Sequence, residues 1–146
     1  VVMARTDIRG VEGLSAALDR AKALQDAGAD AIFAEAMADL HEFEAMRKAV
    51  DVPILANMTE FGKSDLFTVQ QLQDVGVNMV IFPVSLQRIA MGAIERGLDA
   101  LAAEGTLASV VPEMQTRARL YEVVDYAAYG DFDSNVYTFD LSTNRS

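Results

Sequence analysis

Four short apolar runs, separated by segments long enough for helices, constrain the fold of this chain more than any other feature. Their apolar residues are continuous rather than alternating, which is typical of strands covered on both faces, as in parallel sheets. The runs are Val1–Arg5, Ala31–Glu35, Ile54–Asn57 and Met79–Pro83. They predict an α/β fold with a parallel sheet in which each strand is followed by a helix.

The segments between these runs carry apolar residues at helical spacing. Helices are expected over Val11–Ala27, Asp39–Val50, Thr68–Val75 and Ser85–Leu101. Asp39, Thr68 and Ser85 are typical N-cap residues, and Gly28 stands where a left-handed residue ends a helix. Residues 1–112 are therefore expected to form four βα units.

An internal repeat supports this organisation. Leu24–Asp30 resembles Leu72–Asn78, and each segment leads into an apolar run. A helix that ends in glycine before a strand is expected to recur in an array of βα units. Because a closed eight-unit barrel needs about 250 residues, four units predict either half a (β/α)8 barrel with a C-terminal extension or a small, open, flavodoxin-like sheet. A phosphate-binding glycine motif, which would support the open sheet, is absent from the sequence.

The pattern changes after Gly105. Residues 113–130 are expected to form a C-terminal helix that Gly130 ends, and residues 131–146 a polar tail, extended or partly ordered. The chain starts with Val1–Ala4, which is already strand-like, so we interpret the start as a cut inside a fold and expect a larger protein.

Composition excludes several classes of function. The net charge of −10 argues against nucleic acid and anionic membranes as partners. The absence of cysteine excludes disulfides, cysteine-ligated zinc and a thiol nucleophile, and the single histidine, His41, excludes a zinc site built on paired histidines. No apolar run reaches the roughly 18 residues of a membrane span. A cytoplasmic location is the default expectation.

Polar side chains stand at the C-terminal ends of the predicted strands, where the sites of β/α barrels lie. Arg5 ends the first run, Glu35 the second and Asn57 the third. Met58 and Thr59 follow Asn57 in a long polar loop. These strand ends are the expected location of a functional site.

Two further arginines lie in helices. Arg88 stands near the start of the helix after the fourth run, and Arg117 in the C-terminal helix. A cation at a helix start opposes the helix dipole, so the position of Arg88 favours a role with a ligand. Guanidinium groups bind carboxylates through two parallel hydrogen bonds. A site that brings together Arg5, Arg88 and Arg117 would therefore suit a substrate with several carboxylates. Glu35 and Asn57 would then orient a hydroxyl or a metal-bound water.

Structural roles are alternatives for the same residues. Arg5 can form an ion pair with Glu35 or Asp7. The segment that starts at Asn57 can simply make a turn. Arg117 alone is typical of a solvated helix residue. Glu35 requires an explanation in either case, because a charge in an apolar strand is unfavourable unless it is paired.

Several segments, in this order along the chain, resemble the C-terminal half of 2-methylisocitrate lyases, a family of the isocitrate lyase and phosphoenolpyruvate mutase superfamily. They are Met3–Asp7, Phe33–Ala36, Pro53–Gly62, Phe82–Ser85 with Arg88, and Met114–Arg117 with Leu120 and Tyr121. The resemblance extends from residue 1 to about Tyr129 and implies half of an eight-unit TIM-type barrel. It also implies a homotetramer in which the helix at 113–130 packs on a neighbouring subunit.

The family cleaves 2-methylisocitrate to pyruvate and succinate with Mg²⁺, in the methylcitrate cycle of propionate catabolism. By this resemblance the candidate catalytic residues are Arg5, which would hold a substrate carboxylate and stabilise developing charge, and Glu35, which would lie at the metal and substrate site. The residues implied to bind substrate are Arg5, Glu35, Asn57, Met58, Thr59, Arg88 and Arg117.

The sequence also departs from the family. The Lys-Lys-Cys-Gly-His loop that supplies the acid, the aspartates that hold magnesium and the Ser-Gly-Gly substrate loop are absent; in the family they precede the strand that Val1–Arg5 matches. We therefore expect this chain alone to be inactive and to lack direct metal ligands. Alternatives are an isocitrate lyase-like enzyme, an oxaloacetate decarboxylase, a carbon–phosphorus mutase, and a non-catalytic binding module.

Overall fold

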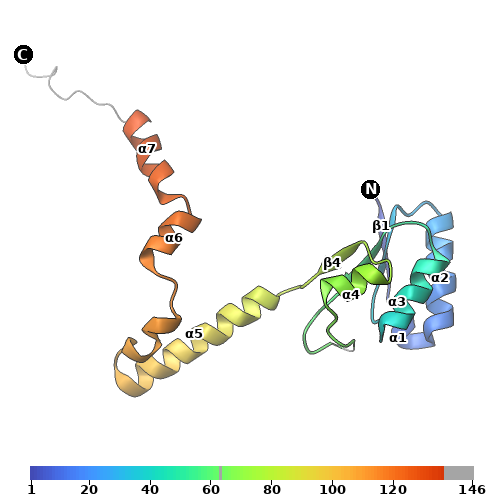
Figure 1. Ribbon diagram of the computed structural model, residues 1–146, viewed down its shortest axis with the longest axis horizontal. Helices are drawn as coiled ribbons and strands as arrows, with labels where there is room; N and C mark the ends of the chain where they lie inside the picture. Colours follow the sequence, from blue (N-terminus) through green and yellow to red (C-terminus); the bar gives the residue numbers. More distant parts are fainter. Residues whose placement is uncertain (63, 137–146) are drawn as a thin grey trace, which may run out of the picture. The chain divides into compact units, whose positions relative to one another are not determined.

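The computed structural model describes residues 1–62 and 64–136 and divides the chain into two compact units, residues 1–93 and 94–146 (Figure 1). The first unit contains a four-stranded parallel sheet with the strand order β1-β2-β3-β4. The strands are β1 (Met3–Thr6), β2 (Ala31–Ala34), β3 (Ile54–Asn57) and β4 (Met79–Ile81). All four predicted strands are confirmed, as is their parallel arrangement.

Helices follow the strands as the βα pattern predicts. They are α1 (Arg9–Glu12), α2 (Leu14–Asp26), α3 (Leu40–Ala49), α4 (Val69–Asp74) and α5 (Ser85–Glu104), which continues into the second unit. The caps at Asp39 and Thr68 are confirmed, since each side chain accepts a hydrogen bond from a main-chain N–H of the first turn. Ser85 is itself the first residue of α5. The helix expected over Val11–Ala27 is two helices, because Gly13 takes a φ of 87° between them.

The core of the first unit lies between the helices and one face of the sheet. Alternate residues of the two central strands enter it: Ile32 and Ala34 from β2, and Ile54 and Ala56 from β3. Helices α2, α3 and α4 contribute Ala17, Ala21, Phe43, Met46 and Leu72, all fully or almost fully buried. Because side chains alternate across a strand, the intervening residues point to the opposite face of the sheet.

That opposite face carries the predicted polar residues. The strand register pairs Arg5 with Phe33 and Asn57 with Ile81. Glu35 follows β2 two residues after Phe33, so it continues the same face. The apolar pattern that buries one set of residues therefore brings the polar set to the other face, at the C-terminal edge of the sheet.

The second unit differs from the sequence-based expectation. The single helix expected over residues 113–130 is a 3₁₀ helix, η1 (Ala108–Glu113), followed by α6 (Arg117–Val123) and α7 (Tyr126–Val136). The break falls at Asp125, whose φ is 49°, a conformation that aspartate tolerates better than most residues. Gly130 lies inside α7, since a glycine in a helix costs only about 1 kcal/mol and does not by itself end one.

The expected polar tail, 131–146, is therefore helical up to Val136, and its remaining residues lie outside the described part of the chain. Packing of the helix at 113–130 on a neighbouring subunit stays a prediction. Within the described ranges, no helix is both long and apolar enough to span a membrane.

Candidate active site

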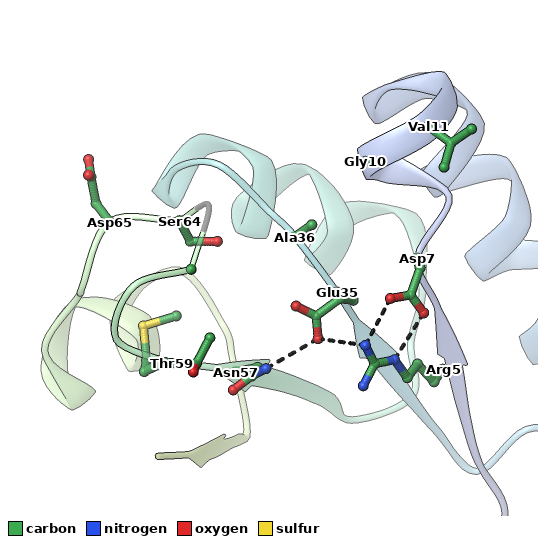
Figure 2. A pocket seen from close by; sticks show the side chains of 12 residues that line it. Arg5, Asp7, Gly10, Val11, Glu35, Ala36, Asn57, Thr59, Ser64 and Asp65 are labelled. Atoms are coloured by element: carbon green, nitrogen blue, oxygen red, sulfur yellow. Dashed lines mark hydrogen bonds and ion pairs between the residues drawn. The ribbon is translucent and has the colours of Figure 1, made fainter. Parts of the chain in front are cut away.

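Arg5 is the centre of a polar cluster at the C-terminal edge of the sheet (Figure 2). Its Nε donates to Oδ2 of Asp7 at 2.9 Å and its Nη2 to Oδ1 of Asp7 at 2.8 Å, so the two side chains form a fork. Nη2 also lies 3.3 Å from Oε2 of Glu35. The guanidinium carbon stands 4.7 Å from the ring centre of Phe33, the register partner of Arg5. The hydrogen bond from Arg5 lowers the pKa of the Asp7 carboxyl.

Glu35 links Arg5 to the end of β3. The same oxygen, Oε2, accepts a hydrogen bond of 3.2 Å from Nδ2 of Asn57. The charge of Glu35 is thus paired, which explains how the structure accommodates it after an apolar strand. The other amide atom of Asn57, Oδ1, is buried and has no hydrogen-bond partner among the described residues. A buried acceptor without a donor is unfavourable, so this atom is suited to receive a donor from a ligand.

A cavity of about 360 Å³ opens beside these side chains. Five of the seven predicted residues line it: Arg5, Glu35, Asn57, Met58 and Thr59. They come from three strand ends and the loop after β3, which Figure 2 shows converging. The volume is within the range of small-molecule sites.

The sequence interpretation of the site omitted two aspartates that line this cavity, Asp7 and Asp65. In the sequence, Asp7 is a possible ion-pair partner for Arg5 and is not among the predicted site residues. Its position two residues after Arg5, hence on the same side of the chain, was the signal that could have placed it at the site.

Arg88 lies near the loop but is not among the residues that line the cavity. Its Nη1 donates to the main-chain oxygen of Glu60 at 3.0 Å and to Oε2 of Glu60 at 3.1 Å. Its guanidinium carbon is 5.5 Å from the ring centre of Phe61. Arg88 therefore contacts the loop that begins at Asn57 through Glu60 and Phe61. Its role in binding substrate stays a prediction.

Arg117 is the first residue of α6, in the second unit, and is exposed. The helix start is fixed by Thr116, whose side chain accepts from the main-chain N–H of Arg119. The contact of Arg117 with a substrate carboxylate also stays a prediction.

The charged side chains that line the cavity in the described part of the chain are Arg5, Asp7, Glu35 and Asp65. Among these described lining residues, three carboxylates and one guanidinium carry charge. Within residues 1–62 and 64–136, no three His, Cys, Asp or Glu side chains gather in a way that could hold a metal ion.

Comparison with known proteins identifies the family of this chain. The phosphoenolpyruvate phosphomutase family profile matches residues 1–102. "Probable 2-methylisocitrate lyase 2" of Corynebacterium glutamicum is 52% identical over 145 residues, which are 99% of this chain and 47% of that protein. The chain therefore spans about half the length of this relative.

Two solved structures are similar in fold. Oxaloacetate acetylhydrolase in complex with the product oxalate has a TM-score of 0.81 at 29% identity, covering 92% of this chain and 46% of that one. A 2,3-dimethylmalate lyase, a PEP mutase/isocitrate lyase superfamily member, has a TM-score of 0.78 at 25% identity. The match covers 92% of this chain and 47% of that one. Together with the parallel strand order, they confirm the predicted fold class: four βα units of a TIM-type barrel. The chain belongs to the phosphoenolpyruvate phosphomutase family, within the superfamily that includes the isocitrate lyases.

Proposed function

We propose that this chain supplies the carboxylate-binding part of the active site of a carbon–carbon lyase that cleaves 2-methylisocitrate to pyruvate and succinate. The observation that carries the proposal is the convergence of Arg5, Glu35 and Asn57 on one cavity. The similarity to a probable 2-methylisocitrate lyase over nearly the whole chain supports this choice of substrate.

The chemistry is a retro-aldol cleavage. A base removes the proton of the substrate hydroxyl, the carbon–carbon bond breaks, and negative charge develops on the departing acid. Arg5 binds a carboxylate and stabilises that charge, since a preorganised cation at the place where charge develops lowers the barrier. Oδ1 of Asn57 accepts from the substrate hydroxyl and so orients it, with Glu35 holding the amide in place.

A tricarboxylate needs more positive charge than the described lining residues of the cavity offer. Arg5 is outnumbered by Asp7, Glu35 and Asp65 among the described lining residues. We propose that Arg88 and Arg117 bind the remaining carboxylates. Arg88 already touches the loop after β3, and its partner Glu60 is exchangeable because the pair is partly exposed.

Other parts of the proposal concern the complete enzyme. We propose a cytoplasmic homotetramer that uses Mg²⁺ with direct ligands outside this chain, and an acid for the carbanion that also lies outside it. The isolated chain would bind substrate-like acids without cleaving them.

Relatives with other substrates define a second candidate. The match to oxaloacetate acetylhydrolase with bound oxalate favours an enzyme that acts on a smaller acid. Arg117 discriminates between the two, because an acid with two carboxylates requires fewer cationic partners. A non-catalytic binding module is the third candidate.

Isothermal titration of the chain with succinate and, separately, with a nucleotide tests the proposal. We expect heat with succinate only. Arg5→Ala should weaken succinate binding by about tenfold or more, because a charge-assisted pair is lost. The matched control is Arg20→Ala on the exposed surface of α2, which should leave binding unchanged. Absence of heat with succinate, or equal loss in both variants, would contradict the proposal.

A further inference from the structure

We infer that Asp7 is a positioning residue, which holds the guanidinium of Arg5 in the orientation that leaves one terminal nitrogen, Nη1, available to a ligand carboxylate. This inference rests on the proposed function, because it assigns a direction to the carboxylate contact proposed for Arg5. It adds a residue that the family resemblance did not include among the candidates.

The hydrogen bonds of Arg5 carry the argument. Asp7 occupies Nε and Nη2 through both of its carboxylate oxygens, and Glu35 lies beside Nη2 as well. Among the residues that the structure describes, none accepts from Nη1; Figure 2 shows this third nitrogen without a dashed line. Since a guanidinium is planar, fixing two of its nitrogens fixes the direction of the third.

The contact with Phe33 adds a second restraint. The ring lies under the guanidinium, 4.7 Å from its carbon, and comes from the neighbouring strand. The ring restrains the plane of the guanidinium, while Asp7 restrains its rotation within that plane. With both in place, the side chain does not have to be ordered when a ligand arrives, which favours binding.

The pair is poorly suited to a purely structural role. The side chains of Arg5 and Asp7 are 52% and 58% exposed, and ion pairs at such exposure contribute little to folding. Both residues also line the cavity. The main effect of the fork is therefore on the geometry of Arg5 and not on the stability of the chain.

The direction of Nη1 restricts how an acid can bind. Its carboxylate must approach from the side of the guanidinium opposite to Asp7, because Asp7 fills the fork formed by Nε and Nη2. An acid that approached from the Asp7 side would meet a carboxylate and be repelled. Asp7 thus combines an attractive contact to Arg5 with a repulsive one to misplaced anions.

The experiment compares two aspartates of the same cavity. Asp7→Asn removes one negative charge and the fork. Asp65→Asn also removes one negative charge from the cavity, but among the described residues Asp65 forms no hydrogen bond or ion pair with Arg5. Succinate is the probe, titrated into the 146-residue chain. We expect Asp7→Asn to weaken binding by about tenfold, as loss of preordering predicts. Asp65→Asn should leave the affinity equal or higher, because it removes only repulsion.

A double variant tests whether Asp7 acts through Arg5. Asp7→Asn combined with Arg5→Ala should bind no worse than Arg5→Ala alone, since additivity fails for residues that share one interaction. The NMR resonance of the Arg5 Nε–H, assigned by its loss in Arg5→Lys, provides a measurement that requires no ligand. Its exchange with solvent should be slow in the wild type and fast in Asp7→Asn. Thermal unfolding of each variant controls for folding.

The outcomes separate this inference from the proposed function. If the wild-type chain does not bind succinate, the proposed function fails and the inference fails with it. If the wild type binds and Asp7→Asn behaves like Asp65→Asn, only the inference is overturned. Unchanged exchange of the Arg5 Nε–H in Asp7→Asn would likewise overturn it.

Discussion

The carboxylate of Glu35 accepts a hydrogen bond of 3.2 Å from the side-chain amide of Asn57, between the ends of two neighbouring strands. This contact fixes which way the amide faces, because the reverse orientation would place two oxygens together. Oδ1 of Asn57 is consequently left as a buried acceptor beside the cavity, without a donor among the described residues. In the function proposed above, this relationship would connect the paired charge of Glu35 to the recognition of a ligand hydroxyl.

The first prediction concerns that hydroxyl. Malate differs from succinate by one hydroxyl group, so Oδ1 of Asn57 should make the chain bind malate more tightly, by up to about tenfold. Asn57→Leu should abolish this preference, whereas Arg20→Ala, on the exposed surface of α2, should preserve it. Calorimetric affinities for the two acids provide the measurement. Equal affinities in the wild type would show that Oδ1 does not receive the ligand hydroxyl.

The second prediction concerns Arg117. In the complete lyase proposed above, Arg117→Ala should lower kcat/KM for 2-methylisocitrate by about 10- to 100-fold, because a charge-assisted contact to one carboxylate is lost. Its exposed position predicts almost no change in thermal stability. Arg119→Ala, on the same helix, is the control. A large drop in melting temperature with intact kinetics would refute the role assigned to Arg117.

The third prediction compares the glycines of the internal repeat. Gly28 and Gly76 both have positive φ, 97° and 85°. A Cβ at Gly28 would meet open space, whereas one at Gly76 would lie 2.5 Å from Cγ of Arg47. Arg47 cannot easily move away, since it also donates to the main-chain oxygen of Val52. Gly28→Ala should cost about 1 kcal/mol of unfolding free energy and Gly76→Ala about 2–3 kcal/mol.

Chemical denaturation of the two glycine variants measures this difference. Equal losses of unfolding free energy in Gly28→Ala and Gly76→Ala would mean that only the backbone conformation matters. Crowding by Arg47 would then have no energetic consequence.

The fourth prediction concerns pH and Glu42. Both oxygens of its carboxylate are bonded to Arg9, at 2.7 and 2.8 Å, and Oε2 also accepts from the N–H of Ala38 at 2.7 Å. The hydrogen bond from Arg9 is the main cause that lowers the pKa of Glu42. A lowered pKa in the folded state contributes stability above the unfolded pKa of about 4.3, and this contribution is lost as pH falls through the folded pKa.

Glu42→Gln should therefore lower the free energy of unfolding by about 1–3 kcal/mol at neutral pH. The gap between wild type and variant should close as the pH falls below about 4. Denaturation at a series of pH values measures it. Glu44→Gln, which loses only the exposed pair with Lys48, should show a much smaller gap. If the difference in unfolding free energy between wild type and Glu42→Gln increased in acid, the lowered pKa of Glu42 would be contradicted.

The fifth prediction concerns association. The outer strands of the sheet are β1 and β4, and exposed strand edges pair readily with other chains. Sedimentation should show dimers or larger assemblies that increase with concentration. Met3→Lys, which places a charge on β1, should reduce them more than Val11→Lys, which places a charge on α1. A monomer at every concentration would argue against this prediction.

Much of the fold was predictable because it depends on local patterns. Continuous apolar runs identify the four strands, and Asp39 and Thr68 stand directly before their helices, so the capping chemistry is visible in the sequence. Parallel strands place their C-terminal ends at one edge. For this reason the cluster of Arg5, Glu35 and Asn57 follows from the order of the residues alone.

Other features were decided only by the tertiary structure. The left-handed residue at Asp125 and the continuation of α7 through Gly130 depend on small differences in backbone free energy that local pattern does not resolve. The division of the Arg5 hydrogen bonds among Asp7, Glu35 and an open nitrogen depends on side-chain directions in three dimensions. Sequence determined which charged groups meet at the edge of the sheet, and folding determined which of their donors and acceptors are satisfied by the protein, because hydrogen bonding requires ångström-scale geometry that spacing along a chain does not encode.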